Sequence, residues 1–448
     1  MDVLIADIQR SRGEHCMRVR KGLRVRNTWG TAPRILAAFV LITASAVATP
    51  SPATAANPTG SRALETVASP DALVKPSSMP IARPGANAVP QALALPGETC
   101  TDTSANRSVC IAVSKPSGRP APITTLAPVP FPSWCAGSGG ASIAGSRTEV
   151  CRVTGLVLTT RRTVNGNTQI TGELSVDVYD YTYGSADLPN WIHQIGVAPW
   201  TGWGDAVNST VTGTLSVAGD CVTDGVSSFP VQSLSPMNNV SRVGEAGART
   251  TATAANAIGY CTTTWNLSVL PTGYPLARAS SAMNEMSCDN AIGANLNRPA
   301  RVGCVIPWYP AEVIYSMSRY PSLATHVDLA QNSGLPGGTL SDPLNRNVND
   351  ADINQNRNLA CGDAPSIAGK NCDEYPLATT YQGLAFGGTR RTFTGCNINA
   401  PTGVTGPTGV SACMITATEN SAQGALMAAF YYDYRVLGGD PYRVGIGS

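Results

Sequence analysis

Alternating apolar and polar positions dominate the middle of the chain and predict β-strands. In TQITGELSVDVYDYTY (168–183), Leu174, Val176 and Val178 share one face, and CRVTGLVLTT (151–160) precedes this run. Asn165-Gly166 between the two runs is a strong hairpin signal. From Tyr179 onward the large side chains, all tyrosines, fall on odd-numbered positions instead of even-numbered ones. This switch indicates a bulge or a strand passing between two environments. Since STVTGTLSV and CTTTWNLSVL repeat the alternation, we expect residues 96–271 to form a β-sandwich-like domain.

The pattern changes after residue 271, so we expect a second, α+β domain over 272–448. PAEVIYSMSRYPSLATHVDLAQ (310–331) predicts an extended piece and then, from Pro321, a helix. SAQGALMAAFYYDYRVL (421–437) repeats apolar residues at i, i+4 and i+8, which predicts a helix that ends at Gly438-Gly439. The Asn- and Asp-rich stretch 340–358 lacks the regular spacing of a calcium loop and is predicted to be a solvated loop.

The beginning of the chain reads as a targeting segment. A basic stretch precedes the apolar run ILAAFVLITASAVA (35–48), and Ala53-Thr54-Ala55 offers a small-residue cleavage site. We therefore expect a signal peptide over 1–56, with Met1 or Met17 as the start, and a secreted protein with no membrane association after cleavage. A single N-terminal anchor is the alternative, but it needs about 20 apolar residues. Residues 57–95 are rich in Pro, Ala and Ser and are predicted to be a disordered linker.

Cysteine count and charge narrow the class of protein. Of 13 cysteines, Cys16 lies in the predicted signal peptide, and the even set of 12 that remains predicts about six disulfides in an oxidising compartment. The chain carries 31 Lys and Arg against 29 Asp and Glu. Without the signal region the balance is slightly acidic, and no basic tail or stripe indicates nucleic-acid binding.

The stretch LPNWIHQIGVAPWTGWGD (188–205) carries the tryptophans Trp191, Trp200 and Trp203 and the histidine His193. Exposed tryptophans could stack on sugars or bases, but core filling in a β domain is the expectation we favour. His193 has no Cys or second His at metal-ligand spacing, so we expect a structural role.

Two acidic motifs in the C-terminal part are candidates for chemistry. NCDEYP (371–376) holds Asp373 and Glu374 side by side, and TEN (418–420) places Glu419 and Asn420 where a strand is expected to give way to a helix. A helix N-terminus is suited to phosphate, and carboxylate and amide oxygens are suited to Mg²⁺ or Mn²⁺. Because neighbouring side chains of an extended chain point to opposite faces, both acids of the first motif converge only if they lie in the turn before Pro376.

These motifs resemble those of the NucA/NucB family of secreted bacterial deoxyribonucleases. The matching elements are Arg319-Tyr320-Pro321 with His326, then Asp373-Glu374-Tyr375-Pro376, and then Glu419-Asn420. They cover only the C-terminal third, so the β-rich region gains no function from the resemblance. The resemblance implies a metal-dependent, largely sequence-nonspecific endonuclease that hydrolyses DNA on a small ββα-metal-like core, with an acid in place of the usual histidine base.

The expected roles follow from the resemblance and from the residue chemistry. Asp373 is the predicted general base, and Glu419 the predicted principal ligand of a divalent Mg²⁺ or Mn²⁺, with Asn420 beside it. Glu374 is expected to be a second ligand or an orienting group. Gln423 is expected to hold metal-bound water or phosphate. His326 either contacts the site from the preceding helix or is structural.

With no basic stripe, the adjacent Arg390 and Arg391 are the predicted phosphate-binding residues, and a solvated turn is the alternative. Two other function classes stay open. The first is a non-catalytic protein that binds the cell surface, cell wall or polysaccharide through the β-rich domain and its tryptophans. The second is a two-carboxylate glycosidase, which needs paired acids at a definite separation. The placement of Glu419 at a helix start suits phosphate better than a sugar.

Overall fold

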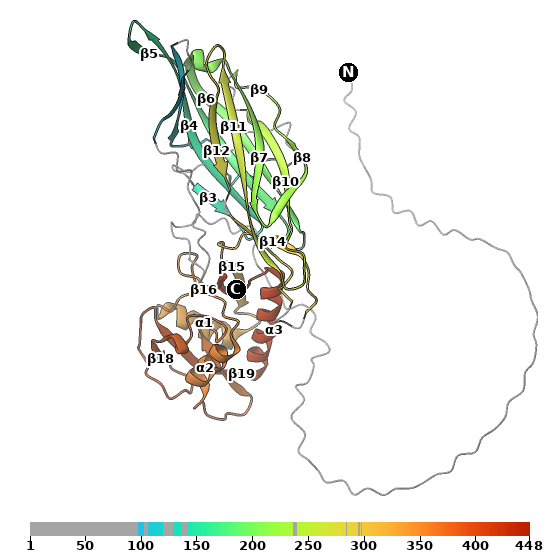
Figure 1. The fold of residues 1–448 in the computed structure, drawn as a ribbon. Helices are drawn as coiled ribbons and strands as arrows, with labels where there is room; N and C mark the ends of the chain where they lie inside the picture. The colour runs from blue at the N-terminus through green and yellow to red at the C-terminus, as the bar shows by residue number, and fades with distance from the viewer. Residues whose placement is uncertain are drawn as a thin grey trace, which may run out of the picture. The chain divides into compact units, whose positions relative to one another are not determined.

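The computed structural model describes residues 97–102, 106–119, 129–135, 142–235, 240–283, 285–293, 296 and 298–448. The predicted signal peptide and linker lie outside these residues. Strands fill the first part of the described chain, and the α-helices all belong to its C-terminal part (Figure 1). Among the described helices, none is both long and apolar enough to cross a bilayer.

The larger sheet has eight strands in the order β1-β2-β4-β5-β6-β10-β8, with β3 paired to β4. The predicted hairpin is confirmed: Val164 pairs with Asn167, and Asn165 and Gly166 have φ of 51° and 79°, as a tight two-residue turn requires. The strands are β1 (Thr99–Asp102), β2 (Arg107–Ser114), β3 (Ser142–Gly145), β4 (Glu149–Val164), β5 (Asn167–Gly184), β6 (Asn190–Gly204), β8 (Cys221–Ser228) and β10 (Arg242–Thr250).

The second sheet has six strands in the order β14-β13-β11-β7-β9, with β12 paired to β11. A short 3-10 helix, η1 (Asp205–Val207), connects β6 of the larger sheet to β7. Because β12, β13 and β14 follow residue 271, this sheet extends to residue 305. The strands are β7 (Ser209–Gly219), β9 (Gln232–Ser233), β11 (Ile258–Pro271), β12 (Ala277–Ala282), β13 (Met286–Asp289) and β14 (Gly303–Val305).

The two sheets share one apolar core, in which Leu174, Ile195 and Trp265 are inaccessible to solvent. The tyrosines of β5 point to the opposite face, where Tyr179 packs against Phe131 at 5.7 Å between ring centroids. The parity switch therefore reflects a strand that is buried on both faces. The register irregularity with β6 lies a few residues earlier, between Ser175 and Val176.

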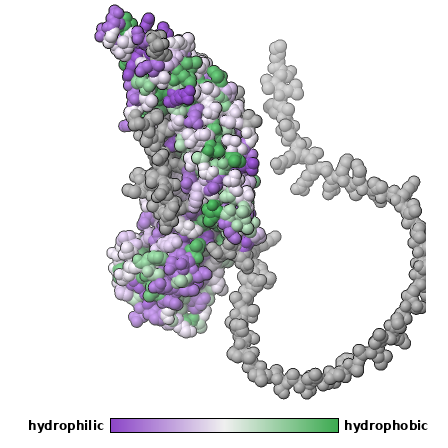
Figure 2. All heavy atoms as spheres, in the orientation of Figure 1, coloured by the Kyte–Doolittle hydropathy of each residue, from purple (hydrophilic) through white to green (hydrophobic). Residues whose placement is uncertain are grey.

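The tryptophans of β6 differ in exposure. Trp191 is buried in the core, as expected, whereas the side chain of Trp203 is 51% exposed. His193 is buried and hydrogen-bonded to Thr263 and Asp180. On the face drawn in Figure 2, hydrophobic (green) residues stand among hydrophilic ones (purple), so the described surface there shows no single large apolar area.

Two three-stranded sheets form the C-terminal part. The first has the order β15-β20-β16, with β15 parallel to β20, and the second has the order β17-β19-β18, with β17 antiparallel to β19. The strands are β15 (Ala311–Ser316), β16 (Leu344–Asn345), β17 (Lys370–Tyr375), β18 (Thr389–Arg391), β19 (Gly409–Thr416) and β20 (Pro441–Gly447), and a 3-10 helix, η2 (Leu384–Phe386), precedes β18.

Three α-helices pack on these sheets. The extended piece followed by a helix from Pro321 is confirmed as β15 and α1 (Pro321–Asn332). The predicted solvated loop is wrong in part, because it contains most of α2 (Asp350–Cys361). The side chain of Asn349 accepts hydrogen bonds from the backbone of the first turn and starts this helix.

The last helix also differs from its prediction. α3 (Ala417–Asp433) begins before Glu419 and ends before Gly438-Gly439. Both Glu419 and Asn420 therefore lie inside the first turn and not at its N-cap.

The predicted disulfide framework is confirmed. Six bridges join all twelve cysteines of the described residues, each within a short span of sequence. They are Cys100–Cys110, Cys135–Cys151, Cys221–Cys261, Cys288–Cys304, Cys361–Cys372 and Cys396–Cys413.

Candidate active site

A cavity of about 770 Å³ lies between α2, α3 and β17. One face of each helix lines it, since the lining residues recur at spacings of three to four. From α2 these are Asp350, Ile353, Arg357 and Cys361, from β17 Cys372 and Glu374, and from α3 Asn420, Gln423, Gly424, Met427, Ala428 and Tyr431. Residues 346–348 and 377–379, together with Leu296, complete the wall. Polar and charged groups therefore line the cavity together with apolar ones.

The strand β17 separates the two adjacent acids. Asp373 and Glu374 are consecutive residues of a regular strand that pairs with β19 through Cys413 and Ala412, so their side chains point to opposite faces. Glu374 lines the cavity, whereas Asp373 is only 2% exposed. The condition for convergence, a turn before Pro376, is not met. Asp373 therefore lies outside the residues that line the cavity, and its role as general base stays a prediction.

Asp373 is held by a buried histidine. Its Oδ2 lies 2.6 Å from Nδ1 of His326 on α1, and Nε2 of His326 lies 2.9 Å from Oγ of Ser411. The Ser411 hydroxyl donates to the carbonyl of Tyr375, so its oxygen accepts from His326. His326 is 1% exposed. The pair therefore fastens β17 to α1 behind the cavity, which favours the structural alternative for His326.

Glu374 is the carboxylate of the cavity. Burial and the negative charge of Asp373 raise the pKa of Glu374 to about 8, while the guanidinium of Arg357 and backbone hydrogen bonds act in the opposite direction. Its Oε2 lies 3.7 Å from Sγ of Cys361 at the end of α2. A carboxylate whose pKa lies near neutral pH is suited to accept a proton during a reaction.

Glu419 and Asn420 diverge because they are consecutive residues of a helix. Oε2 of Glu419 accepts the backbone N–H of Leu323 at 2.9 Å. It thereby caps α1, whose N-cap residue Tyr320 makes no side-chain cap bond. Glu419 does not line the cavity, and its role as the principal metal ligand stays a prediction.

Asn420, in contrast, lines the cavity. Its Nδ2 donates to the carbonyl oxygen of Cys372 at 2.9 Å, which fixes the amide against β17. Because the amide nitrogen is engaged there, Oδ1 is the atom left to bind a ligand, and among the described residues no donor is bonded to it.

The guanidinium groups of the cavity belong to Arg346 and Arg357, which the sequence did not indicate. Arg346 lies over the ring of Tyr431 at 4.3 Å from its centroid and donates from Nη1 to the carbonyl of Val436. Arg346 is 5% exposed, whereas Arg357 is exposed on the cavity face of α2. Two guanidinium groups in the cavity that Glu374 lines form an electrostatic environment suited to an anionic ligand.

The arginines predicted from the sequence lie elsewhere. Arg391 is 1% exposed and donates to Ser333 and to the carbonyls of Gly406 and Thr408, so its role is structural. Arg390 forms an ion pair with Asp363 at 2.6 Å. Neither lines the cavity, and their phosphate-binding role stays a prediction. Gln423 does line it, with 7% exposure.

The donor set of the cavity fits a divalent cation such as Mg²⁺ or Mn²⁺. The Asn420 amide supplies a hard oxygen ligand, the Glu374 carboxylate lies in the same cavity to accept a proton, and Mg²⁺ usually completes its shell with water and substrate phosphate. The cluster of candidate ligands found elsewhere in the described residues, Glu98 with Cys100 and Cys110, is unsuitable because its two cysteines form a disulfide.

Comparison with known families identifies the region around the cavity. Residues 339–445 match the family model for deoxyribonuclease NucA/NucB. The C-terminal region contains a NucA/NucB domain. The matched span holds every residue that lines the cavity except Leu296, and it excludes α1 with His326 as well as the β-rich region. No curated protein and no solved structure matches the chain.

Proposed function

We propose that the protein is a secreted, metal-dependent endonuclease that hydrolyses DNA phosphodiester bonds with little regard to sequence. The observation that carries this proposal is the position of Glu374 inside the NucA/NucB domain, in a cavity that it shares with Arg346, Arg357 and Asn420. Carboxylate, amide and guanidinium groups that line one cavity are suited to bind a phosphodiester backbone. Contacts of this kind position a nucleic acid without reading its sequence.

The local topology supports a ββα-metal-like core for this activity. β17 runs antiparallel to β19, and α3 begins at the residue after β19. Asn420 therefore stands in the first turn of a helix, where backbone N–H groups and the helix dipole favour a phosphate. We take β17, β19 and α3 to be the ββα unit, with its ligand-binding end facing the cavity.

The proposed reaction is a displacement at phosphorus by water. Glu374 accepts the proton as the water oxygen attacks, the bond to the leaving oxygen breaks, and that oxygen takes a proton from solvent. Arg346 and Arg357 bind the non-bridging oxygens of the phosphate. Asn420 is the candidate cation ligand, and a bound cation would supply positive charge that offsets the charge building on phosphate. Asp373 and Glu419 hold the strand and helix in position.

Export is the second part of the proposal. Six disulfides among the described residues are compatible with an oxidising, extracellular environment. DNA met outside a cell is long and of arbitrary sequence, which suits a cavity directed at the backbone.

The test is plasmid degradation by the purified chain with Mg²⁺ or Mn²⁺. We expect hydrolysis that EDTA abolishes, and we expect Glu374→Gln to remove it while the circular dichroism spectrum stays unchanged. Glu173→Gln on β5 is the matched control and should keep the full rate. Wild-type protein that cleaves no DNA with any divalent ion, or a fully active Glu374→Gln variant, would refute the proposal.

A further inference from the structure

Two buried arginines join the β-rich region to the C-terminal part of the chain. Arg435 follows α3, and Arg147 lies in the turn between β3 and β4. Their exposed fractions are 0% and 3%. A buried guanidinium has to be paired and hydrogen-bonded, so the partners of each arginine show which parts of the chain depend on one another.

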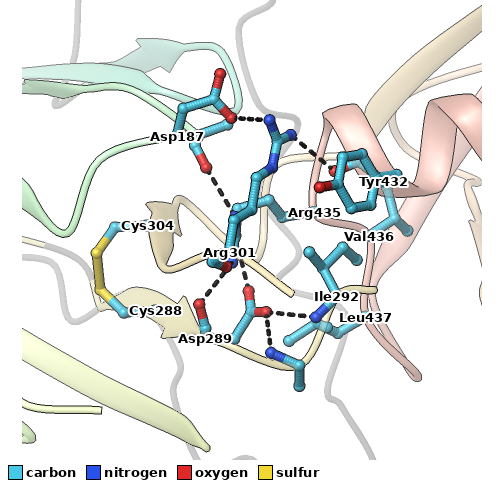
Figure 3. Close-up of polar contacts among 12 residues, drawn as sticks. Asp187, Cys288, Asp289, Ile292, Arg301, Cys304, Tyr432, Arg435, Val436 and Leu437 are labelled. Atoms are coloured by element: carbon cyan, nitrogen blue, oxygen red, sulfur yellow. Dashed lines mark hydrogen bonds and ion pairs between the residues drawn. A yellow bond between two sulfur atoms is a disulfide. The ribbon is translucent and has the colours of Figure 1, made fainter. Parts of the chain in front are cut away.

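Arg435 reaches from the end of α3 into the β-rich region (Figure 3). Its Nε donates to Oδ2 of Asp289 on β13 at 2.8 Å, and Nη2 donates to the carbonyl of Arg301 at 2.6 Å. Nη1 donates to the carbonyl of Ala186, which follows β5, at 2.9 Å. Asp289 is itself inaccessible to solvent. All three guanidinium nitrogens of Arg435 therefore donate hydrogen bonds to residues of the β-rich region, which lies before β15 in the sequence.

The backbone conformation of Arg435 is one that a residue with a side chain rarely adopts. The residue adopts φ 48°, in the left-handed region that favours glycine, directly after the C-cap of α3. The N–H of Val436 bonds the carbonyl of Tyr431 at 2.9 Å, as a Schellman ending requires. An arginine at a position suited to glycine indicates that the side chain contributes more than its backbone conformation costs.

Arg147 makes the reciprocal contact from the β-rich region. Its Nε donates to the carbonyl of Tyr434 at 3.0 Å, and Nη2 donates to the carbonyl of Arg435 at 2.7 Å and forms an ion pair with Asp440. Nη1 donates to the carbonyl of Pro307 at 2.8 Å. The carbonyls of the C-cap residue of α3 and of the residue that follows it are thus bound by a side chain of the β-rich region.

The connection between the two regions is packed and not a free linker. From β14 to the start of β15, residues 303–311 are all buried except Trp308, which is half-buried. A second ion-pair group borders the contact, since Arg301 pairs with Asp187 and with Asp433 on α3. Continuous burial along the chain is unlike the exposed linkers that separate independent domains.

We infer that the β-rich region is a structural part of the nuclease fold, which fixes the C-terminal end of α3, and that the two regions unfold as one cooperative unit. α3 also lines the cavity from Asn420 to Tyr431, so the β-rich region holds one wall of the site in position. The inference predicts that the β-rich region is not an independently folded module attached to the C-terminal part. It concerns folding and does not rest on the proposed nuclease activity.

The test uses the full chain and two physical measurements, thermal unfolding and amide hydrogen exchange. Wild-type protein should unfold in a single transition. Asp289→Asn leaves the guanidinium of Arg435 without its charged partner and should lower Tm by roughly 4 to 7 °C. Exchange in the last two turns of α3, far from residue 289 in sequence, should accelerate at least about tenfold. The matched control Arg161→Gln, which breaks an exposed ion pair with Glu98 within the β-rich region, should change Tm by less than about 3 °C.

The variant Arg435→Gly distinguishes the contribution of the Arg435 side chain to stability from the cost of its left-handed backbone conformation. Glycine relieves the left-handed conformation, so a purely local role for Arg435 predicts an unchanged or higher Tm, whereas the inference predicts a lower one. Two separate transitions in the wild type, unchanged exchange of α3 in Asp289→Asn, or a Tm of Arg435→Gly at or above wild type would each overturn the inference. None of these outcomes depends on whether the protein cleaves DNA.

Discussion

Replacing Glu374 by glutamine should stabilise the protein while removing its activity, and the gain should depend on pH. Glutamine keeps nearly the same shape as glutamate but stays neutral at every pH. Glu374 lies in the cavity, where burial and the charge of Asp373 raise the pKa of Glu374 from 4.5 to about 8. A carboxylate that is needed for catalysis but is buried where its charge is unfavourable lowers the stability of the folded protein, so removing the charge should raise stability and lower activity.

The sign and size of the effect follow from this pKa. Glu374 holds its proton more tightly in the folded state than in the unfolded state. Protonation of Glu374 therefore contributes fully to the free energy of unfolding below pH about 4.5, and this contribution is lost as the pH rises to about 8. At about 1.36 kcal/mol per pKa unit, the loss relative to a neutral side chain is about 3 kcal/mol at pH 7 and approaches about 5 kcal/mol above pH 8. Because Glu374 keeps contact with solvent, we halve these values to about 1.5 and 2.5 kcal/mol.

The assay is urea unfolding of wild type and Glu374→Gln in EDTA at pH 5, 7 and 8.5, followed by circular dichroism. We expect the variant to exceed wild type by less than about 0.5 kcal/mol at pH 5 and by about 2 kcal/mol at pH 8.5. Glu173→Gln on β5, outside the cavity, is the control measured in parallel. A variant that is no more stable than wild type at pH 8.5, or a difference that is the same at all three values, would refute the reasoning.

Three further predictions concern the walls of the cavity. Asn420→Ala should raise the Mg²⁺ or Mn²⁺ concentration needed for half-maximal cleavage at least about tenfold, and an unchanged metal titration would contradict its role as a ligand. Arg357→Gln should raise KM for DNA by roughly 10- to 100-fold, whereas Arg390→Gln, whose partner lies outside the cavity, should leave KM unchanged. Replacing Cys361 and Cys372 together by serine should lower the free energy of unfolding by about 3 kcal/mol, since the bridge closes a short loop, and equal stability in urea would be the contrary result.

Local sequence patterns predicted the elements in which side-chain periodicity and turn chemistry agree. The hairpin at Asn165-Gly166 and the start of α1 at Pro321 are of this kind. The helix α2 was not predicted because one of its three buried positions is the polar residue Asn356. Its apolar residues therefore do not recur at the spacing that indicates an amphipathic helix. The N-cap at Asn349 was the available signal for this helix.

The family match covers the part of the chain in which the sequence places the two acidic motifs, but β17 directs the adjacent acids of the first motif to opposite faces. Spacing places Asp373 and Glu374 together, and only the regular extension of β17 shows that Glu374 turns toward the cavity and Asp373 toward α1. Arg346 and Arg357 come from the stretch that was predicted to be a loop. No local pattern indicates that tertiary packing brings them to Glu374.

The central claim is that Glu374, and not its neighbour Asp373, is the carboxylate that acts on DNA. It is tested most directly by the initial rate of plasmid cleavage per folded molecule, compared between Glu374→Gln and Asp373→Asn at saturating Mg²⁺ or Mn²⁺. The account predicts a loss of roughly 10²- to 10⁴-fold for Glu374→Gln, and a rate near wild type for the fraction of Asp373→Asn that stays folded. Full activity in Glu374→Gln together with an inactive but folded Asp373→Asn would contradict it.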